Sequence, residues 1–444
     1  MKTTRLLFLA LLALALAVAA GCGGGDDESG GGGGTESAAK GNEDVSGTVT
    51  VQAVWTGQEG ESFQAVIDGF NKKFPNVDVQ YKSAQDIATV VSTAVEGGNP
   101  PDIAALPNPG LMKDFASRKA LKPIDFANDT ISENYSQDWI DLGTVDGTLY
   151  GVFFKGANKS SVWYNVPVFE DAGVEPPQTW DDLLAAAKTI NASGVPAYSI
   201  GGSEGWTLTD LFENIYLRTA GPEKYDQLTK HELKWTDPSV KKALTTMGEI
   251  LGDPENMVGG TSGALQTDFP TSVSNVFTNS PKGSQVIEGD FVPGVVASSN
   301  ALKPKTGYDV FTFPSVDGSG PTVVGGGDEL MMFRDTPAIR ALVNYLSTGE
   351  AQTIWAKLGG YSAPAKTVEA DAYPDDITRT TATAIGKADT FRFDLSDLQP
   401  ASFGGTVGQG EFKIFQDFLK NPKNVDGIAS ALESAAAKAY ASGK

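Results

Sequence analysis

The chain has 444 residues, a formal net charge of −21 at pH 7, one cysteine and one histidine. A strongly acidic protein is repelled by nucleic acid and by anionic lipid surfaces, so neither is an expected partner. One cysteine excludes an internal disulfide, and one histidine excludes a metal site built from several histidines. We therefore expect neither a metal nor another cofactor.

The first 22 residues have the pattern of an export signal. A positively charged start is followed by an apolar run, 6–20, which is too short to span a membrane comfortably. The small residues before Cys22 resemble the lipobox of bacterial lipoproteins, although Ala19 stands where leucine is usual. We expect 1–21 to be a lipoprotein signal peptide and Cys22 to carry a lipid anchor outside the cytoplasm. The alternative is an ordinary secretory signal with an incidental cysteine.

A glycine-rich, acidic segment follows at residues 22–46 and contains almost nothing to bury. Such a segment does not offset the entropy cost of ordering, so it is predicted to be a disordered tether. The remaining chain, about 400 residues long, is sufficient for two or more domains. The pattern therefore predicts a folded acidic body held near a membrane.

The folded body begins with alternating strand and helix patterns. Apolar and polar residues alternate at 49–53 and again at 77–81, which predicts two strands. Between them, apolar residues recur at helical spacing over 63–74, and 102–106 is a short buried strand. This order predicts an α/β fold with a mainly parallel sheet and right-handed crossovers.

Five later helices follow from the same periodicity. They are predicted at 179–191, 239–251, 336–347, 412–419 and 425–441. Thr336 precedes Pro337, which places a capping side chain before a proline at the first helical position. Trp180, Trp235 and Trp355 lie within helix or strand patterns, so we expect them in the core.

Motifs for catalysis and nucleotide binding are absent from the sequence. His231 lies between a lysine and a glutamate and is expected at the surface, and no Gly-x-Ser-x-Gly elbow or P-loop occurs. The three glycines at 325–327 lack the spacing of a dinucleotide fingerprint and are better explained by a backbone crossing between lobes. We therefore expect no enzymatic activity.

Aromatic residues instead stand beside carboxylates and amides in glycine-rich stretches. The residues in these stretches are Trp55, Gln58, Glu59, Trp163, Glu204, Trp206, Asp210, Asp290 and Phe291. Loops that follow parallel strands converge on ligands, and an indole can stack on the C–H face of a sugar while carboxylates accept its hydroxyl protons. A single large aromatic is more often a core residue. Its acidic and glycine-rich surroundings nevertheless favour Trp206, held in a loop, and Asp290 as ligand contacts.

The order of several motifs resembles a known family. These motifs lie at 97–104, 148–165, 176–184 and 289–291. Together they resemble the solute-binding proteins of carbohydrate-importing ABC transporters, and in particular the branch that handles α-glucosides and other oligosaccharides. The resemblance covers nearly the whole mature chain; each motif is degenerate, and the order of the motifs is the specific feature.

The resemblance implies a periplasmic-binding-protein-like fold of two α/β lobes that close on a ligand by hinge bending. Residues 45–157 with about 328–360 would form the N-terminal lobe. Residues 158–327 with about 361–444 would form the C-terminal lobe. The protein would be a monomer that delivers its ligand to permease subunits served by a separate ATPase.

The resemblance also distributes the site between the lobes and adds Asn108 to it. By position in the family order, Gln58, Glu59 and Asn108 would come from the first lobe. Trp163, Trp206, Asp210 and Asp290 would come from the second.

The sequence thus predicts a lipid-anchored protein that captures a sugar or oligosaccharide without making or breaking a bond. Two alternatives remain open. Aromatics and paired carboxylates also build the sites of extracellular glycoside hydrolases. Tryptophan beside acidic residues also suits a cationic solute, such as a polyamine or a betaine, through cation–π contacts.

Overall fold

A computed structural model of the chain describes residues 44–84, 86–299, 302–385 and 388–442. The predicted signal peptide, Cys22 and nearly all of the predicted tether lie outside the described residues. Among the described residues, no helix has both the length and the apolar character that a membrane span requires.

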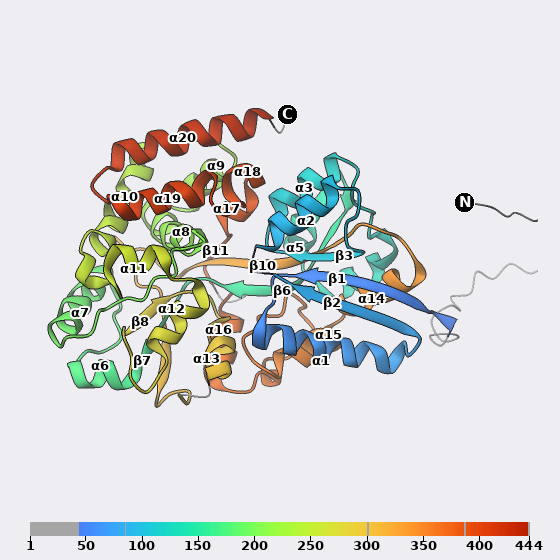
Figure 1. Cartoon of the computed structure of the whole chain (residues 1–444), viewed down its shortest axis with the longest axis horizontal. Helices are drawn as coiled ribbons and strands as arrows, with labels where there is room; N and C mark the ends of the chain where they lie inside the picture. The colour runs from blue at the N-terminus through green and yellow to red at the C-terminus, as the bar shows by residue number, and fades with distance from the viewer. Residues whose placement is uncertain (1–43, 85, 300–301, 386–387, 443–444) are drawn as a thin grey trace, which may run out of the picture. The chain divides into compact units, whose positions relative to one another are not determined.

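Eleven strands are present in the described chain, and six of them form the main sheet (Figure 1). The strands are β1 (Gly47–Ala53), β2 (Val77–Ser83), β3 (Ile103–Leu106), β4 (Thr144–Val145), β5 (Thr148–Leu149), β6 (Gly151–Asn158), β7 (Ser161–Asn165), β8 (Gln285–Ile287), β9 (Tyr308–Thr312), β10 (Thr322–Met332) and β11 (Thr390–Phe393). The order of the main sheet is β11-β10-β3-β1-β2, and β6 also pairs with β10. A second sheet has the order β8-β7-β9.

The prediction of a mainly parallel sheet is wrong for much of the chain. The β1 strand pairs in parallel with β2 and β3, and β10 pairs in parallel with β11. However, β10 runs antiparallel to β3 and β6, and the second sheet is antiparallel throughout. Because β6 leads the chain away from the first strands and β10 leads it back, these two neighbours run in opposite directions.

Helices cover both sheets and include the five that periodicity predicts. They are α1 (Gly57–Lys73), α2 (Ile87–Glu96), α3 (Pro109–Ser117), α4 (Asn128–Asn134), α5 (Gln137–Leu142), α6 (Val166–Ala172), α7 (Trp180–Ala192), α8 (Trp206–Ala220), α9 (Pro222–Thr229), α10 (Pro238–Leu251), α11 (Gly260–Gln266), α12 (Phe269–Val276), α13 (Val292–Ser299), α14 (Pro337–Leu346), α15 (Gly349–Ala356), α16 (Asp376–Ala384), α17 (Leu395–Leu398), α18 (Ala401–Gly404), α19 (Gly410–Lys420) and α20 (Val425–Ser442). Thr336 caps α14 as predicted, because its hydroxyl accepts the backbone N–H of Ile339.

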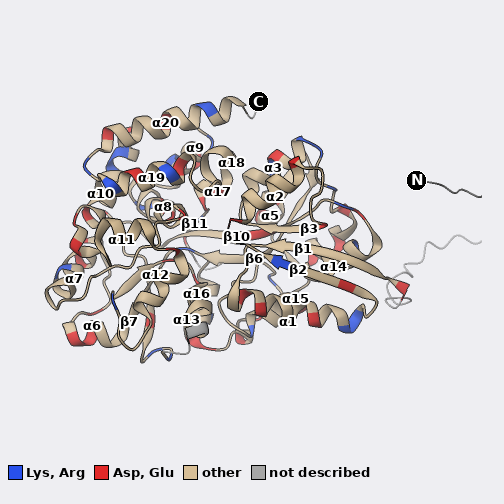
Figure 2. Ribbon diagram, viewed as in Figure 1, with Lys and Arg blue, Asp and Glu red and all other residues tan. Residues whose placement is uncertain are grey.

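Apolar side chains gather in two main cores. The first core surrounds β1, α1, α14 and α15 and includes Phe63 and Trp355. The second core surrounds α7, α8, α10, α19 and α20 and includes Trp180 and Trp235. The prediction that these three tryptophans lie in the core is confirmed, since none is more than 5% exposed. Figure 2 shows charged residues mainly on helices and loops, whereas the strands are mostly uncharged.

The β10 strand connects the two cores. Its Val324 packs in the second core and its Leu330 packs in the first. The glycines at 325–327 permit the close approach of β6, because a Cβ on Gly327 would lie 2.6 Å from the carbonyl oxygen of Lys155. The strand that contains these glycines thus passes from one core to the other, and its role as a crossing between lobes stays a prediction.

His231 is half-buried rather than fully solvated, because its ring stacks on Tyr440 and lies 3.3 Å from a carboxylate oxygen of Glu433.

The exact lobe boundaries stay a prediction. Tyr361, which follows the predicted boundary near residue 360, packs in the first core.

Candidate ligand-binding site

A cavity of about 260 Å³ lies where the loops after β1, β2 and β3 meet the strands β6 and β10 and the first turns of several helices. The loops after the parallel strands contribute Asp86 and Asn108, and the first turn of α1 contributes Gln58. Its opposite side is formed by residues that begin or precede α8, α12, α13 and α19. The cavity is therefore placed at the carboxyl ends of parallel strands, where ligands bind in open α/β sheets.

One wall of the cavity is aromatic. Trp206, Phe269, Phe291 and Phe412 all line it. The ring centroids of Trp206 and Phe269 are 5.4 Å apart, and those of Phe269 and Phe291 are 5.2 Å apart at 81°. These tilted contacts hold the rings as a rigid apolar surface.

Trp206 is the first residue of α8, so the prediction of a loop position is wrong. The turn before it requires glycine, because Gly205 has a φ of 95° and a Cβ there would lie 2.6 Å from the Cβ of Phe412. The glycine-rich stretch therefore starts a helix and directs its first side chain into the cavity.

The facing wall is polar and charged. Glu59, in the first turn of α1, accepts a hydrogen bond from the Lys155 ammonium, whose Nζ lies 2.5 Å from Glu59 Oε1. The same Nζ lies 5.3 Å from the centroid of the Phe291 ring. Burial opposes the charge of Lys155, but the carboxylates of Glu59 and Asp328 outweigh it and raise the pKa of Lys155. This lysine is therefore charged and paired.

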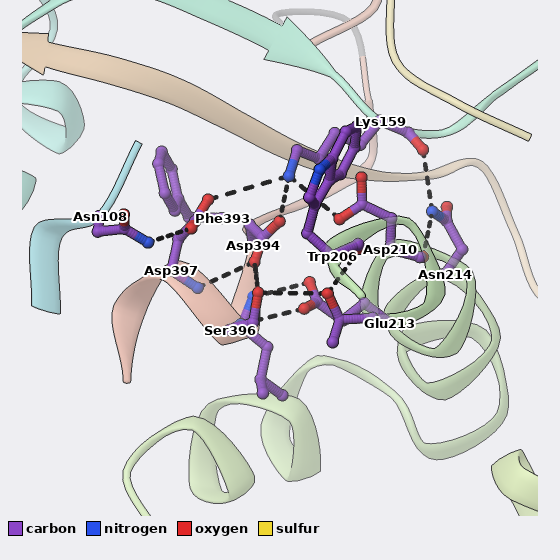
Figure 3. A network of polar contacts seen from close by, with 12 residues as sticks. Asn108, Lys159, Trp206, Asp210, Glu213, Asn214, Phe393, Asp394, Ser396 and Asp397 are labelled. Carbon is purple, nitrogen blue, oxygen red and sulfur yellow. Dashed lines mark hydrogen bonds and ion pairs between the residues drawn. The ribbon is translucent and has the colours of Figure 1, made fainter. Parts of the chain in front are cut away.

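A second buried charge cluster surrounds Lys159, on the short connection from β6 to β7 (Figure 3). Lys159 Nζ lies 3.1 Å from Asp210 Oδ1 and 3.9 Å from Asp397 Oδ2, and it also donates to Asp394. It is 5.7 Å from the centroid of the Trp206 ring. One ammonium group thus lies close to three carboxyl groups.

The excess of carboxyl groups shifts their ionisation. Burial raises the pKa of Asp210 to about 8, and burial together with Asp394 raises the pKa of Asp397 well above its usual value. Burial opposes the charge of Asp394 too, but Lys159 outweighs it and lowers the pKa of Asp394. At neutral pH the ionised pair is therefore Lys159 with Asp394.

Asp397 is a cavity residue that sequence reasoning missed. Its Oδ1 accepts a hydrogen bond of 2.6 Å from the side-chain amide of Asn108 (Figure 3). Its Oδ2 is buried and has no hydrogen-bond partner among the described residues. Because Asp397 lines the cavity, this oxygen is available to a ligand hydroxyl. Neither a neighbouring aromatic nor an adjacent glycine marks Asp397 in the sequence.

The cavity brings together half of the predicted site residues. Those that line it are Gln58, Glu59, Asn108, Trp206 and Phe291. Other lining residues that the sequence analysis did not select as ligand contacts include Asp86, Lys155, Lys159, Phe269, Asp328, Asp397 and Phe412.

The other predicted residues lie behind the lining and support it. Trp55 is fully buried and donates its indole N–H to Asp328 at 2.6 Å. Trp163 is also buried and donates to the backbone carbonyl of Gly289 at 3.0 Å. Asp210 pairs with Lys159, as described above. Each of these three residues therefore holds a neighbour in place through a buried hydrogen bond or ion pair.

The last two predicted residues hold neighbouring backbone segments. Glu204 accepts the backbone N–H of Phe269 at 3.3 Å, at the start of α12. Asp290 is buried and accepts the hydroxyl of Ser362, and burial raises the pKa of Asp290 to about 6. Both residues therefore bind segments next to the aromatic wall, and neither lines the cavity.

Comparison with known proteins agrees with this architecture. A model of the bacterial extracellular solute-binding protein family matches residues 55–353. The chain is 34% identical over 379 residues to the osmoprotective compounds-binding protein GgtB of Synechocystis sp., which covers 84% of this chain and 88% of that protein. It is 32% identical over 416 residues to the alpha-glucosides-binding periplasmic protein AglE of Rhizobium meliloti. This match covers 90% of this chain and 89% of that protein.

Solved structures show the same fold at lower identity. The bacterial solute receptor AcbH has a TM-score of 0.78 at 20% identity, covering 89% of this chain and 99% of that one. The GacH receptor of Streptomyces glaucescens has a TM-score of 0.70 at 19% identity, covering 89% and 99%. Both are receptors for solutes and share the mixed α/β periplasmic-binding-protein fold. The chain belongs to the bacterial extracellular solute-binding proteins, a family of binding proteins and not of enzymes.

Proposed function

We propose that the chain is the substrate-binding component of a carbohydrate ABC importer, which captures a sugar or oligosaccharide and delivers it to a permease. The observation that carries this proposal is the pairing of an aromatic wall with a polar wall in one cavity. A pyranose has an apolar C–H face that suits Trp206 and hydroxyl groups that suit carboxylates and amides. The similarity to the alpha-glucosides-binding protein AglE supports a sugar as the ligand, and the similarity to GgtB, which binds osmoprotective compounds, supports a small solute.

A cationic solute is less well supported than a sugar. Cation–π binding requires an accessible aromatic face near the ligand. Lys159 and Lys155 lie 5.7 Å and 5.3 Å from the centroids of Trp206 and Phe291. A cationic ligand would therefore approach rings beside which the protein already holds two ammonium groups.

The proposal also includes the setting of the protein. Cys22 would carry a lipid anchor, and residues 22–46 would form the tether between the membrane and a monomeric body. The two predicted lobes would close around the ligand, and the transporter's ATPase would be a separate chain. The lipobox-like sequence and the acidic, glycine-rich segment support these assignments.

A panel of ligands tests the proposal. Thermal unfolding of the mature protein is measured with α-glucosides, other oligosaccharides, polyamines and betaines. A ligand that binds the native state raises the melting temperature in a concentration-dependent way. We expect a shift with at least one sugar and none with the amines. A shift with the amines alone would favour the cationic alternative, and hydrolysis of a bound sugar would contradict a binding role.

A further inference from the structure

Both cations of the cavity are already bound by acidic residues of the chain. Lys155 is 5% exposed at its side chain and pairs with Glu59, while Lys159 is 11% exposed and contacts Asp210, Asp394 and Asp397. Each ammonium is held by short polar contacts within the protein, so neither is free to neutralise a charged ligand.

The remaining ionisable groups of the lining are carboxyl groups. Among the described residues that line the cavity, the ionisable side chains besides the two lysines are Glu59, Asp86, Asp328 and Asp397. Asp328 already accepts the Trp55 indole N–H, and Asp397 Oδ2 has no hydrogen-bond partner among the described residues. An incoming anion would therefore meet carboxyl oxygens without gaining a free cation.

Glu59 removes a further source of positive potential. It lies in the first turn of α1, a helix of 17 residues that begins beside the cavity. A helix N-terminus favours an anion because its first N–H groups are unpaired and the helix dipole is positive there. Glu59 places its own carboxylate at this end while it binds Lys155.

We propose that the cavity selects uncharged sugars and rejects sugars that carry a carboxylate or a phosphate, and that Glu59 determines this selectivity by occupying Lys155. The inference rests on the proposed function and specifies the ligand class of the same site. A ligand phosphate would have to break an ion pair or lie against carboxylates, and like charges brought together in a protein interface are strongly unfavourable.

Matched sugar pairs test the selectivity. Isothermal titration calorimetry compares trehalose with trehalose 6-phosphate, maltose with maltose 1-phosphate, and methyl α-glucoside with methyl α-glucuronide. For each neutral sugar that binds, we expect its anionic partner to bind about a hundredfold more weakly or not at all. Equal affinity within a pair would overturn the selectivity while leaving sugar binding intact. No binding of any neutral sugar, here or in the thermal panel, would overturn the proposed function and this inference with it.

Two variants test the role assigned to Glu59. Glu59→Gln should release Lys155 and raise the affinity for the anionic partner at least about tenfold relative to the neutral sugar. The control is Glu61→Gln, which changes an exposed residue of the same helix and should leave this ratio unchanged. Glu59→Ala removes the same carboxylate from Lys155 and provides a second measurement if Glu59→Gln does not fold. An unchanged ratio in the folded variants would show that Glu59 does not determine the selectivity.

Discussion

Trp206 has the clearest individual role in the candidate site. Its ring lies within an aromatic wall with Phe269 and Phe291, and Lys159 Nζ lies 5.7 Å from its centroid. Gly205 sets its direction through a backbone conformation that other residues rarely adopt. The function of the indole is therefore separable from the stability of either core.

We predict that Trp206→Ala weakens binding of the best sugar from the panel by roughly ten- to a hundredfold. Removal of the indole loses apolar contact worth roughly 1–3 kcal/mol. Calorimetry measures the dissociation constant. The control is Trp139→Ala, because Trp139 is half-buried against Phe153 and does not line the cavity. This control should lose melting temperature and keep its affinity; wild-type affinity in Trp206→Ala would remove the indole from the site.

Asp210 makes stability depend on pH in a defined direction. Its folded-state pKa is raised from 3.8 to about 8, so the folded protein keeps this proton where the unfolded chain has lost it. Between about pH 4 and pH 8 the contribution of Asp210 to stability therefore falls as the pH rises. The other acids of the cluster with raised pKa values act in the same direction.

We predict that Asp210→Asn reduces the loss of stability between pH 5 and pH 9, because the amide accepts a hydrogen bond from Lys159 and does not ionise. Urea unfolding at several pH values measures the free energy of unfolding. Asp181→Asn, at an exposed position in the first turn of α7, is the control and should follow the wild type. Parallel curves for Asp210→Asn and the wild type would contradict the prediction.

At the scale of elements, α3 and α17 meet directly at the edge of the cavity. The contact contains the hydrogen bond from Asn108 to Asp397, and both residues are buried. Beside it, Gly110 in the first turn of α3 approaches the backbone so closely that a Cβ would lie 1.9 Å from the carbonyl oxygen of Gln399. The absence of a side chain at Gly110 therefore permits Asn108 to reach Asp397.

We predict that Gly110→Ala weakens sugar binding by separating α3 from α17. Alanine favours helix, so the change does not disfavour α3 itself. Calorimetry with the best sugar measures the affinity, and circular dichroism measures the helix content. Gly320→Ala is the control, because no heavy atom lies within 4 Å of a Cβ at that position. Equal affinity of Gly110→Ala and this control would mean that the contact does not support the site.

At the scale of the whole molecule, β10 carries the connection between the two cores. All 11 of its residues are buried, and it pairs with β3, β6 and β11. Asp328 on this strand lines the cavity between the two walls. The cavity and the connection between the cores therefore share a strand, and a ligand in the cavity contacts the segment that joins the two parts of the fold.

The attachment of the whole molecule to the membrane is tested at one residue. We predict that Cys22→Ser abolishes acylation and leaves folding of the mature body unchanged, because Cys22 is the single cysteine of the chain. Labelling with a fatty-acid analogue in the producing cells measures acylation, and circular dichroism of the purified protein measures folding. Equal label in the variant and the wild type would contradict the lipid anchor.

Interactions between near neighbours in the sequence could be predicted without the tertiary structure. The apolar spacing of α1 and α20 depends on residues three or four positions apart, and the capping box of α7 joins Thr179 to Asp182. The order of motifs along the chain was sufficient to indicate the family. The sequence by itself therefore determined six of the helices, several strands and the class of protein.

Only the tertiary structure decided which polar residues meet. The partners of Asp397 and Lys159 show this, because Asn108 is 289 positions from Asp397 and Lys159 is 235 positions from Asp394. Trp55 has the same aromatic and glycine-rich context as Trp206. It lies between β1 and α1, where it is fully buried and donates to Asp328, whereas Trp206 begins α8 and lines the cavity. Local composition specifies which groups are available, but the paths of β6 and β10 decide which of them lie together, because they bring distant loops to the same cavity.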